Sequence, residues 1–115
     1  LVATDPQFAG DAFGAIRGVV LIDGGGYDIA LALTMPEMEA PLIYRDVFGT
    51  DPARHKALSP LTHVGERDAP QWLMLHVAER AATTRQAGTF AAALTKAGRS
   101  ATIVPLAGTN HMRIN

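Results

Sequence analysis

Residues 70–106 decide the fold, and they read PQWLMLHVAERAATTRQAGTFAAALTKAGRSATIVPL. Two short apolar runs, Trp72–Val77 and Ala101–Leu106, have the length and composition of buried strands. Between them, over Thr84–Ala97, apolar side chains recur at helical spacing: Ala87, Phe90, Ala91 and Leu94. A strand, a helix and a strand joined by short links form a right-handed βαβ unit, so we predict that the two strands are parallel.

The ends of the predicted helix carry capping residues. Thr83 or Thr84 is placed to cap its start, and Gly98 stands where a helix commonly ends on glycine. A third apolar, β-branched run, Ile16–Ile22, stops at Asp23 and the three glycines that follow it. A run that is apolar on both faces is typical of a buried parallel strand. The sequence therefore predicts an α/β fold with three parallel strands and one crossover helix.

The segment 28–69 between the first two strands differs from the rest of the chain, because prolines divide it into short pieces. Met38–Phe48 predicts one helix, and Asp51 followed by Pro52 predicts a second, short one with Asp51 as its cap. Such a stretch is too long for a plain crossover between neighbouring strands. Long insertions at strand ends often carry binding or lid functions, so we expect 28–69 to line a ligand pocket.

Composition limits the function classes. The chain has 115 residues, 48% hydrophobic and 18% charged, a net charge of −1 and a pI near 6.4, which suits one globular domain and gives no electrostatic support for binding nucleic acid or anionic membrane. No apolar run approaches the roughly 18 residues of a membrane span. The absence of cysteine is typical of a reducing compartment, and we expect a cytoplasmic protein. Because the chain opens on Leu1 without Met, we expect it to be part of a longer protein.

Ionisable side chains follow each predicted strand. Asp23 and Asp28 come after the first, Glu79 after the second and His111 after the third. The carboxyl ends of parallel strands are where α/β proteins place functional residues. A carboxylate beside a histidine fixes the ring tautomer and stabilises the imidazolium that forms when the ring takes a proton. The alternatives are a solvated His111 and a surface ion pair between Glu79 and Arg80.

The other histidines and the glycine run favour structural roles. His76 lies within a predicted strand and is expected to be packed in the core, and His55 and His63 have no second ligand at a useful spacing, so we expect no metal site. Residues 24–26 are glycine, but Ile29 stands where a dinucleotide-binding GxGxxG motif requires glycine. A tight turn in which glycine relaxes the backbone is the better interpretation, and no organic cofactor is implied.

Four stretches, taken in order, resemble the C-terminal half of an α/β-hydrolase. They are IRGVVLIDGGGYD (16–28), YRDVFGTDPARHKALSPLTHV (44–64), PQWLMLHVAE (70–79) and AGTNHMRIN (107–115). The similarity is to the esterase and lipase type, close to bacterial carboxylesterases and arylformamidase-like enzymes. The resemblance implies a partial α/β-hydrolase fold in which 70–115 carries the triad acid and histidine.

In this resemblance His111 is the general base and Glu79 the acid of the triad. The family pattern is His-Gly-x-x-Asp, whereas the chain has Glu79 one residue early and Arg80 at the usual Asp position. For this reason Asp23 and Asp28 stay open as alternative acids.

The nucleophile of the family lies on a Gly-x-Ser-x-Gly turn, which residues 1–115 do not contain. Ser59 and Ser100 are the only serines, and neither follows a predicted strand. We therefore expect the nucleophilic serine upstream of Leu1.

The resemblance implies a serine hydrolase in the parent chain, acting on a small-molecule carboxylic ester or aryl amide, with this portion alone inactive. The alternative is a non-catalytic, hydrolase-like or small-ligand-binding α/β module. If Ile16–Ile22 lacks a neighbour on its far side, its apolar edge predicts self-association into a homo-oligomer.

Overall fold

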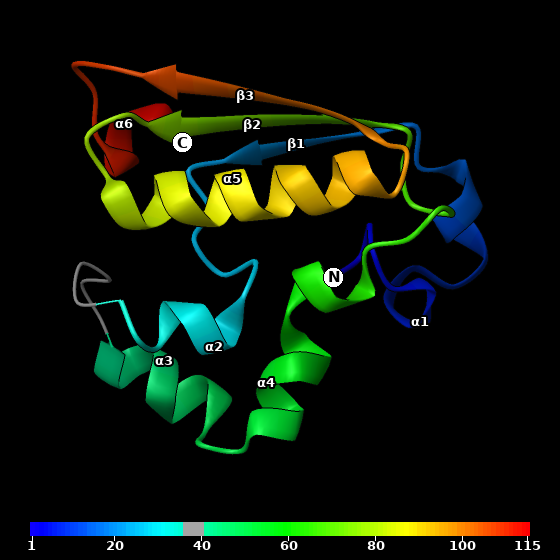
Figure 1. Ribbon diagram of the computed structural model, residues 1–115, viewed down its shortest axis with the longest axis horizontal. Helices are drawn as coiled ribbons and strands as arrows, with labels where there is room; N and C mark the ends of the chain where they lie inside the picture. The colour runs from blue at the N-terminus through cyan, green and yellow to red at the C-terminus, as the bar shows by residue number, and fades with distance from the viewer. Residues whose placement is uncertain (36–40) are drawn as a thin grey trace.

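The computed structural model describes residues 1–35 and 41–115, of which 41–44 are described by their backbone alone. In these residues a three-stranded sheet has the order β1 (Gly18–Ile22), β2 (Gln71–Val77), β3 (Ser100–Leu106), and all its strands are parallel (Figure 1). The predicted α/β class and the three parallel strands are confirmed.

The register of the sheet places three loops together. Ile22 pairs with Leu75, and Val77 pairs with Leu106. The carboxyl ends of β1, β2 and β3 therefore meet at one edge, which we call the carboxyl edge. The loops that follow the strands, beginning at Asp23, Ala78 and Ala107, all leave from this edge.

Helix α5 (Ala81–Lys96) covers one face of the sheet and forms the main core with it (Figure 1). Trp72 and Met74 from β2 pack against Phe90 and Leu94 from α5, and all four are buried. The rings of Trp72 and Phe90 meet edge to face, with centroids 5.5 Å apart. This packing confirms the apolar stripe predicted from the sequence.

The start of α5 differs from the prediction. The helix begins three residues earlier than Thr84, its N-cap is Arg80, and no side chain caps it. Thr83 and Thr84 lie inside the first turn, so their predicted capping role is wrong. At the other end Gly98 adopts a φ of +77°, the left-handed conformation in which glycine commonly ends a helix.

The opposite face of the sheet is more open. Figure 1 shows α2, α3, α4 and α5 on the same side of the strands. On the other side Val20 and Ile22 of β1 are 59% and 41% exposed. The prediction that β1 is buried on both faces is therefore wrong in the described structure. β1 is also an edge strand of this sheet, with backbone groups available to pair with another strand. Self-association of the chain through β1 stays a prediction.

The long connection between β1 and β2 is helical and irregular, as predicted. It contains α2 (Ile29–Ala32), α3 (Pro41–Phe48), α4 (Pro52–Leu58) and the 3₁₀ turn η2 (Pro60–His63). Asp51 caps α4 by accepting a hydrogen bond from Ala53 N–H at 2.9 Å. The start of the helix predicted from Met38 lies outside the described residues.

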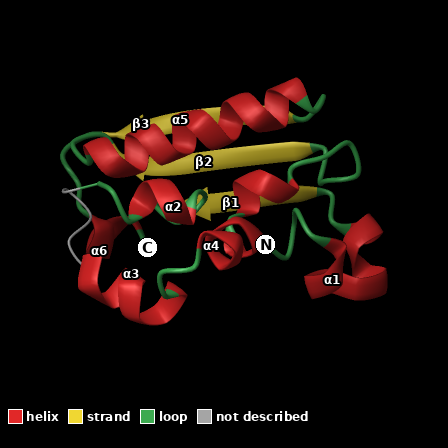
Figure 2. Ribbon diagram, turned by 60° about the horizontal axis from the view of Figure 1, so that its bottom comes forward, coloured by secondary structure: helices red, strands yellow, loops and turns green. Residues whose placement is uncertain are grey.

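Short helical pieces also occupy both ends of the chain. They are α1 (Pro6–Ala9), the 3₁₀ turn η1 (Gly10–Ala15) and α6 (His111–Ile114). Figure 2 shows α6 near the carboxyl edge of the sheet, on the side of the molecule where α5 begins. None of the helices in the described part of the chain has the length and hydrophobicity that a transmembrane segment requires.

Candidate functional site

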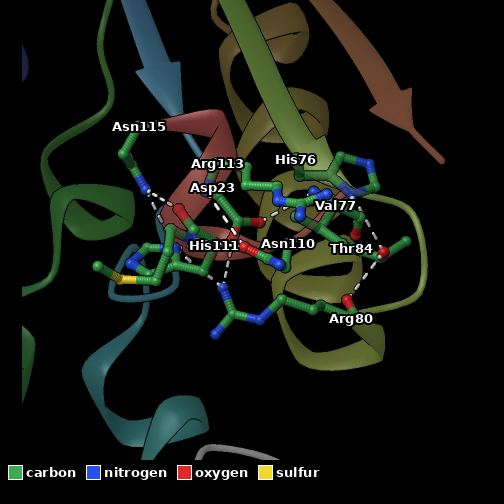
Figure 3. Close-up of polar contacts among 10 residues, drawn as sticks. Asp23, His76, Val77, Arg80, Thr84, Asn110, His111, Arg113 and Asn115 are labelled. Carbon is green, nitrogen blue, oxygen red and sulfur yellow. Dashed lines mark hydrogen bonds and ion pairs between the residues drawn. The ribbon is translucent and has the colours of Figure 1, made fainter. Parts of the chain in front are cut away.

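Three ionisable side chains converge at the carboxyl edge, each from the loop after a different strand (Figure 3). Asp23 follows β1, Arg80 follows β2 and His111 follows β3 as the first residue of α6. Both Arg80 and His111 contact the same carboxylate oxygen, Oδ2 of Asp23. The parallel register explains this convergence, because it brings the three loops together.

His111 is held at the start of α6 by its neighbours. Asn110 caps the helix, its side-chain oxygen accepting from Met112 N–H at 3.1 Å and Arg113 N–H at 3.2 Å. Asn115 Nδ2 donates to the His111 carbonyl at 2.7 Å. The His111 ring places Nδ1 2.8 Å from Asp23 Oδ2, while 52% of the side chain is exposed. Among the described residues no group hydrogen-bonds to its Nε2.

The Asp23 carboxylate is fully buried, with 0% of the side chain exposed. Its backbone N–H extends the sheet pairing by donating to Leu75 O at 2.7 Å. A φ of +47° then turns the residue so that Oδ1 accepts from Val77 N–H at 3.0 Å. This left-handed conformation is uncommon outside glycine, although aspartate tolerates it better than most residues do. It directs the carboxylate back over the end of β2, toward Arg80 and His111.

The surroundings of Asp23 favour its ionised form. Burial by itself would raise the pKa of this carboxyl, but hydrogen bonds from Val77 N–H, His111 and Arg80, together with the Arg80 charge, outweigh it. The net result is a pKa below the ordinary carboxyl value of 3.8. Asp23 is therefore a buried anion near neutral pH, and it can only accept hydrogen bonds.

An ionised Asp23 fixes the tautomer of His111. The 2.8 Å separation between Nδ1 and Oδ2 requires a hydrogen between them, and an ionised carboxylate has none to give, so Nδ1 carries it. Arg80 Nη1 and Asn115 Nδ2 lie further from Nδ1, at 3.2 Å each. In the neutral ring Nε2 then has a free lone pair, which makes it the basic atom of the site.

Glu79 does not make the contact expected from the sequence. It is exposed, and its Oε1 accepts from Gly108 N–H at 3.2 Å, so it links the loops after β2 and β3. The structure therefore corrects the expected contact between Glu79 and His111. The carboxylate at His111 is Asp23, one of the two alternatives that the sequence left open.

Asp28, the second alternative, caps a helix, and in the described part of the chain it makes no hydrogen bond with His111. Its Oδ1 caps α2 by accepting from Leu31 N–H at 3.0 Å. The buried Gln86 side chain then bonds to both the backbone N–H and the carbonyl of Asp28, each at 2.9 Å. These contacts attach the start of the insertion to α5.

The glycine run after Asp23 provides space rather than unusual backbone angles. In the described residues the positive φ values of this turn belong to Asp23 alone, and Gly24 and Gly26 have none. A Cβ on Gly24 would lie 2.6 Å from the Tyr27 hydroxyl and 3.1 Å from its ring. Tyr27 cannot move away easily, because it is buried and stacks on Phe90 at 4.9 Å. The prediction that glycine is needed here for its backbone freedom is thus wrong, because Gly24 is needed for the space beside Tyr27.

Neither serine lies beside His111. Ser59 is 1% exposed, donates to His55 O at 2.7 Å and accepts from Ile29 N–H at 2.9 Å, so it joins α4 to α2. Ser100 begins β3, at the opposite end of the strand from the His111 loop. The structure brings no serine hydroxyl of this chain to the basic nitrogen of His111.

The remaining histidines are structural. His76 is 3% exposed, as predicted for a packed residue, with Nδ1 3.3 Å from Thr84 Oγ1. His55 Nε2 donates to Gly49 O and His63 Nε2 to Ala57 O, both at 2.8 Å. Within the residues that the structure describes, no group of three or more His, Asp or Glu side chains is arranged to hold a metal ion.

The sequence predicts His111 and Asp23 as candidates for this site, but it gives no role there to Arg80. The available signal was its position, since Arg80 stands where the family pattern has its aspartate. Comparisons with protein families, with curated proteins and with solved structures gave no match. The resemblance to α/β-hydrolases therefore remains a hypothesis carried by the residues.

Proposed function

We propose that His111 and Asp23 are the base and the acid of a serine-hydrolase triad, and that the chain is the C-terminal portion of an α/β-hydrolase domain. The observation that carries the proposal is the 2.8 Å contact between His111 Nδ1 and the buried carboxylate of Asp23. A triad base requires a buried acid, an oriented imidazole and a second ring nitrogen with a free lone pair.

In the proposed reaction Nε2 of His111 accepts the proton of a serine hydroxyl as the serine oxygen attacks the carbonyl carbon of an ester or aryl amide. The ionised Asp23 stabilises the imidazolium that results. His111 then gives the proton to the leaving alcohol or amine as the acyl-serine forms. A water molecule then attacks the carbonyl carbon of the acyl-serine while His111 Nε2 accepts its proton. The carboxylic acid leaves, and His111 returns the proton to the serine oxygen. The steps require no metal or organic cofactor.

The proposal places the acid after β1 instead of after β2, where the family pattern has it. Two observations support this position. Asp23 contacts His111 directly, and the residue at the usual acid position, Arg80, contacts the same Asp23 oxygen. A positive side chain at the usual acid position is compatible with a triad whose acid has moved to the neighbouring strand.

The nucleophile comes from outside residues 1–115 in this proposal, because Ser59 and Ser100 are held elsewhere. The test is expression of the complete reading frame that contains this sequence, assayed with p-nitrophenyl butyrate. We expect hydrolysis that His111→Ala abolishes and that Glu79→Gln leaves nearly unchanged.

The 115-residue chain alone serves as the control, and we expect no turnover from it. Turnover by this chain that His111→Ala abolishes would contradict an external nucleophile. A complete protein that hydrolyses neither esters nor aryl amides would favour the non-catalytic, ligand-binding alternative.

A further inference from the structure

We infer that Arg80 binds a carboxylate group beside His111, so that the preferred substrate is an ester or amide that carries a negative charge. The substrate assignment rests on the proposed function, whereas the anion site itself rests on the geometry of Arg80.

The Arg80 guanidinium uses one nitrogen for its contacts within the chain. Nη1 contacts Asp23 Oδ2 and lies 3.2 Å from His111 Nδ1. Nε and Nη2 have no hydrogen-bond partner among the described residues, and 31% of the side chain is exposed. These two nitrogens form one side of the planar guanidinium, and their parallel N–H groups match the two oxygens of a carboxylate.

The position of the guanidinium connects this free side to the chemistry. Figure 3 shows the Arg80 side chain extending from the start of α5 to Asp23 and His111. Arg80 Nη1 lies 3.2 Å from His111 Nδ1. We therefore expect that a short dicarboxylic acid monoester is long enough to reach from the free side of the guanidinium to His111 Nε2. The ester carbonyl and the carboxylate of such a molecule can therefore occupy the two positions together.

The end of helix α5 also favours an anion. Arg80 is the N-cap of the 16-residue helix α5, whose N-terminal end carries partial positive charge. The negative charge of Asp23 is shared among three donors, because Val77 N–H and His111 bond to the carboxylate as well as Arg80. The other nearby acid, Glu79, is exposed and bonds to Gly108 N–H.

The binding test uses the 115-residue chain and a matched pair of probes, butyrate and the neutral butyramide. We expect butyrate to shift the NMR signals of the Arg80 Nε–H and the His111 ring in a saturable way, and butyramide to shift neither. Arg80→Gln should weaken butyrate binding at least about tenfold, which is about 1.4 kcal/mol. Arg80→Lys should weaken it less, because the charge is kept while the paired N–H groups are lost.

Arg85→Gln is the matched control, because it removes the same charge from an exposed position on the same helix. We expect this variant to bind butyrate as the unmodified chain does. Equal butyrate binding by Arg80→Gln and Arg85→Gln, or no saturable shift in the unmodified chain, would overturn the anion site.

The substrate test uses the complete protein and two esters, p-nitrophenyl butyrate and mono-p-nitrophenyl glutarate. Arg80→Gln should lower kcat/KM for the glutarate ester about tenfold more than for the butyrate ester, chiefly through KM. Any loss transmitted through Asp23 affects both esters and cancels in the ratio. Equal losses for both esters would overturn the substrate assignment alone, whereas no hydrolysis of either would mean that the proposed function has failed.

Discussion

Asp23 and Glu79 are acidic residues that follow β1 and β2 at the carboxyl edge, and their environments differ. Asp23 is fully buried and accepts hydrogen bonds from Val77 N–H, Arg80 and His111. Glu79 is exposed and accepts from Gly108 N–H. Both residues follow a parallel strand at the same edge of one sheet. A position in a loop at this edge therefore does not decide which carboxylate bonds to His111.

The difference arises from the backbone. Asp23 turns through a φ of +47° directly after β1, so its short side chain points back over the end of β2. Three donors then surround the carboxylate: the Val77 N–H and the side chains of Arg80 and His111. An exposed carboxylate such as Glu79 is solvated and screened, and its interactions contribute little to stability.

Under the proposed function, the largest expected effect is on ester hydrolysis by the complete protein. Asp23→Asn should lower kcat about 10⁴-fold, because an amide no longer selects the His111 tautomer with a basic Nε2. Glu79→Gln should change kcat less than about threefold, since its carboxylate touches only the Gly108 backbone among the described residues. Initial rates with p-nitrophenyl butyrate measure both. The reverse order of effects would make Glu79 the acid.

The second expected effect is on stability. Asp23→Asn should lower the free energy of unfolding of the 115-residue chain by about 1–3 kcal/mol, because the buried charge-assisted hydrogen bonds are lost. Asparagine tolerates the left-handed φ, so the change tests the charge rather than the turn. Glu79→Gln should cost less than about 0.5 kcal/mol. Urea unfolding followed by circular dichroism gives both values, and equal costs would contradict the comparison.

The third prediction concerns the turn that carries Asp23. Gly24→Ala should destabilise the fold by about 1–3 kcal/mol, because its Cβ would meet the Tyr27 hydroxyl at 2.6 Å. Gly26→Ala is the control, since its nearest contact would be Ile29 Cδ1 at an ordinary 3.6 Å. Thermal unfolding compares the two variants. A Gly26→Ala variant as unstable as Gly24→Ala would indicate that backbone freedom matters instead.

The smallest expected effect is the pH dependence of stability. The pKa of Asp23 is lowered by folding, so its ionised form stabilises the folded state above the ordinary value of 3.8. This contribution is lost as the pH falls below 3.8 through the folded-state pKa. We expect the unfolding free energy of Asp23→Asn to fall less steeply than that of the unmodified chain in this range. Parallel curves for the two proteins would contradict the lowered pKa.

Much of the fold follows from local pattern. The apolar runs locate all three strands, and the spacing of Ala87, Phe90, Ala91 and Leu94 gives the buried face of α5. The start of α5 could not be predicted in the same way, because its N-cap Arg80 makes no side-chain capping bond. The exposure of Val20 and Ile22 also depends on which elements cover the sheet, and that is not written in the strand itself.

The site was predictable as a set of candidates but not as a pair. Parallel strands place Asp23, Glu79 and His111 at one edge, which follows from the order of the elements. The partner of His111 depends on the φ of one residue and on a donor from Val77, 54 positions away from Asp23. The pattern of residues along the chain gives neither this backbone angle nor this long-range hydrogen bond.

The central claim is that Asp23, and not Glu79, accepts the Nδ1 proton of His111. The most direct measurement is the low-field proton NMR signal of the His111 Nδ1–H in the 115-residue chain. We expect this signal in the unmodified chain and in Glu79→Gln, and its loss in Asp23→Asn. Loss of the signal in Glu79→Gln with retention in Asp23→Asn would contradict the account.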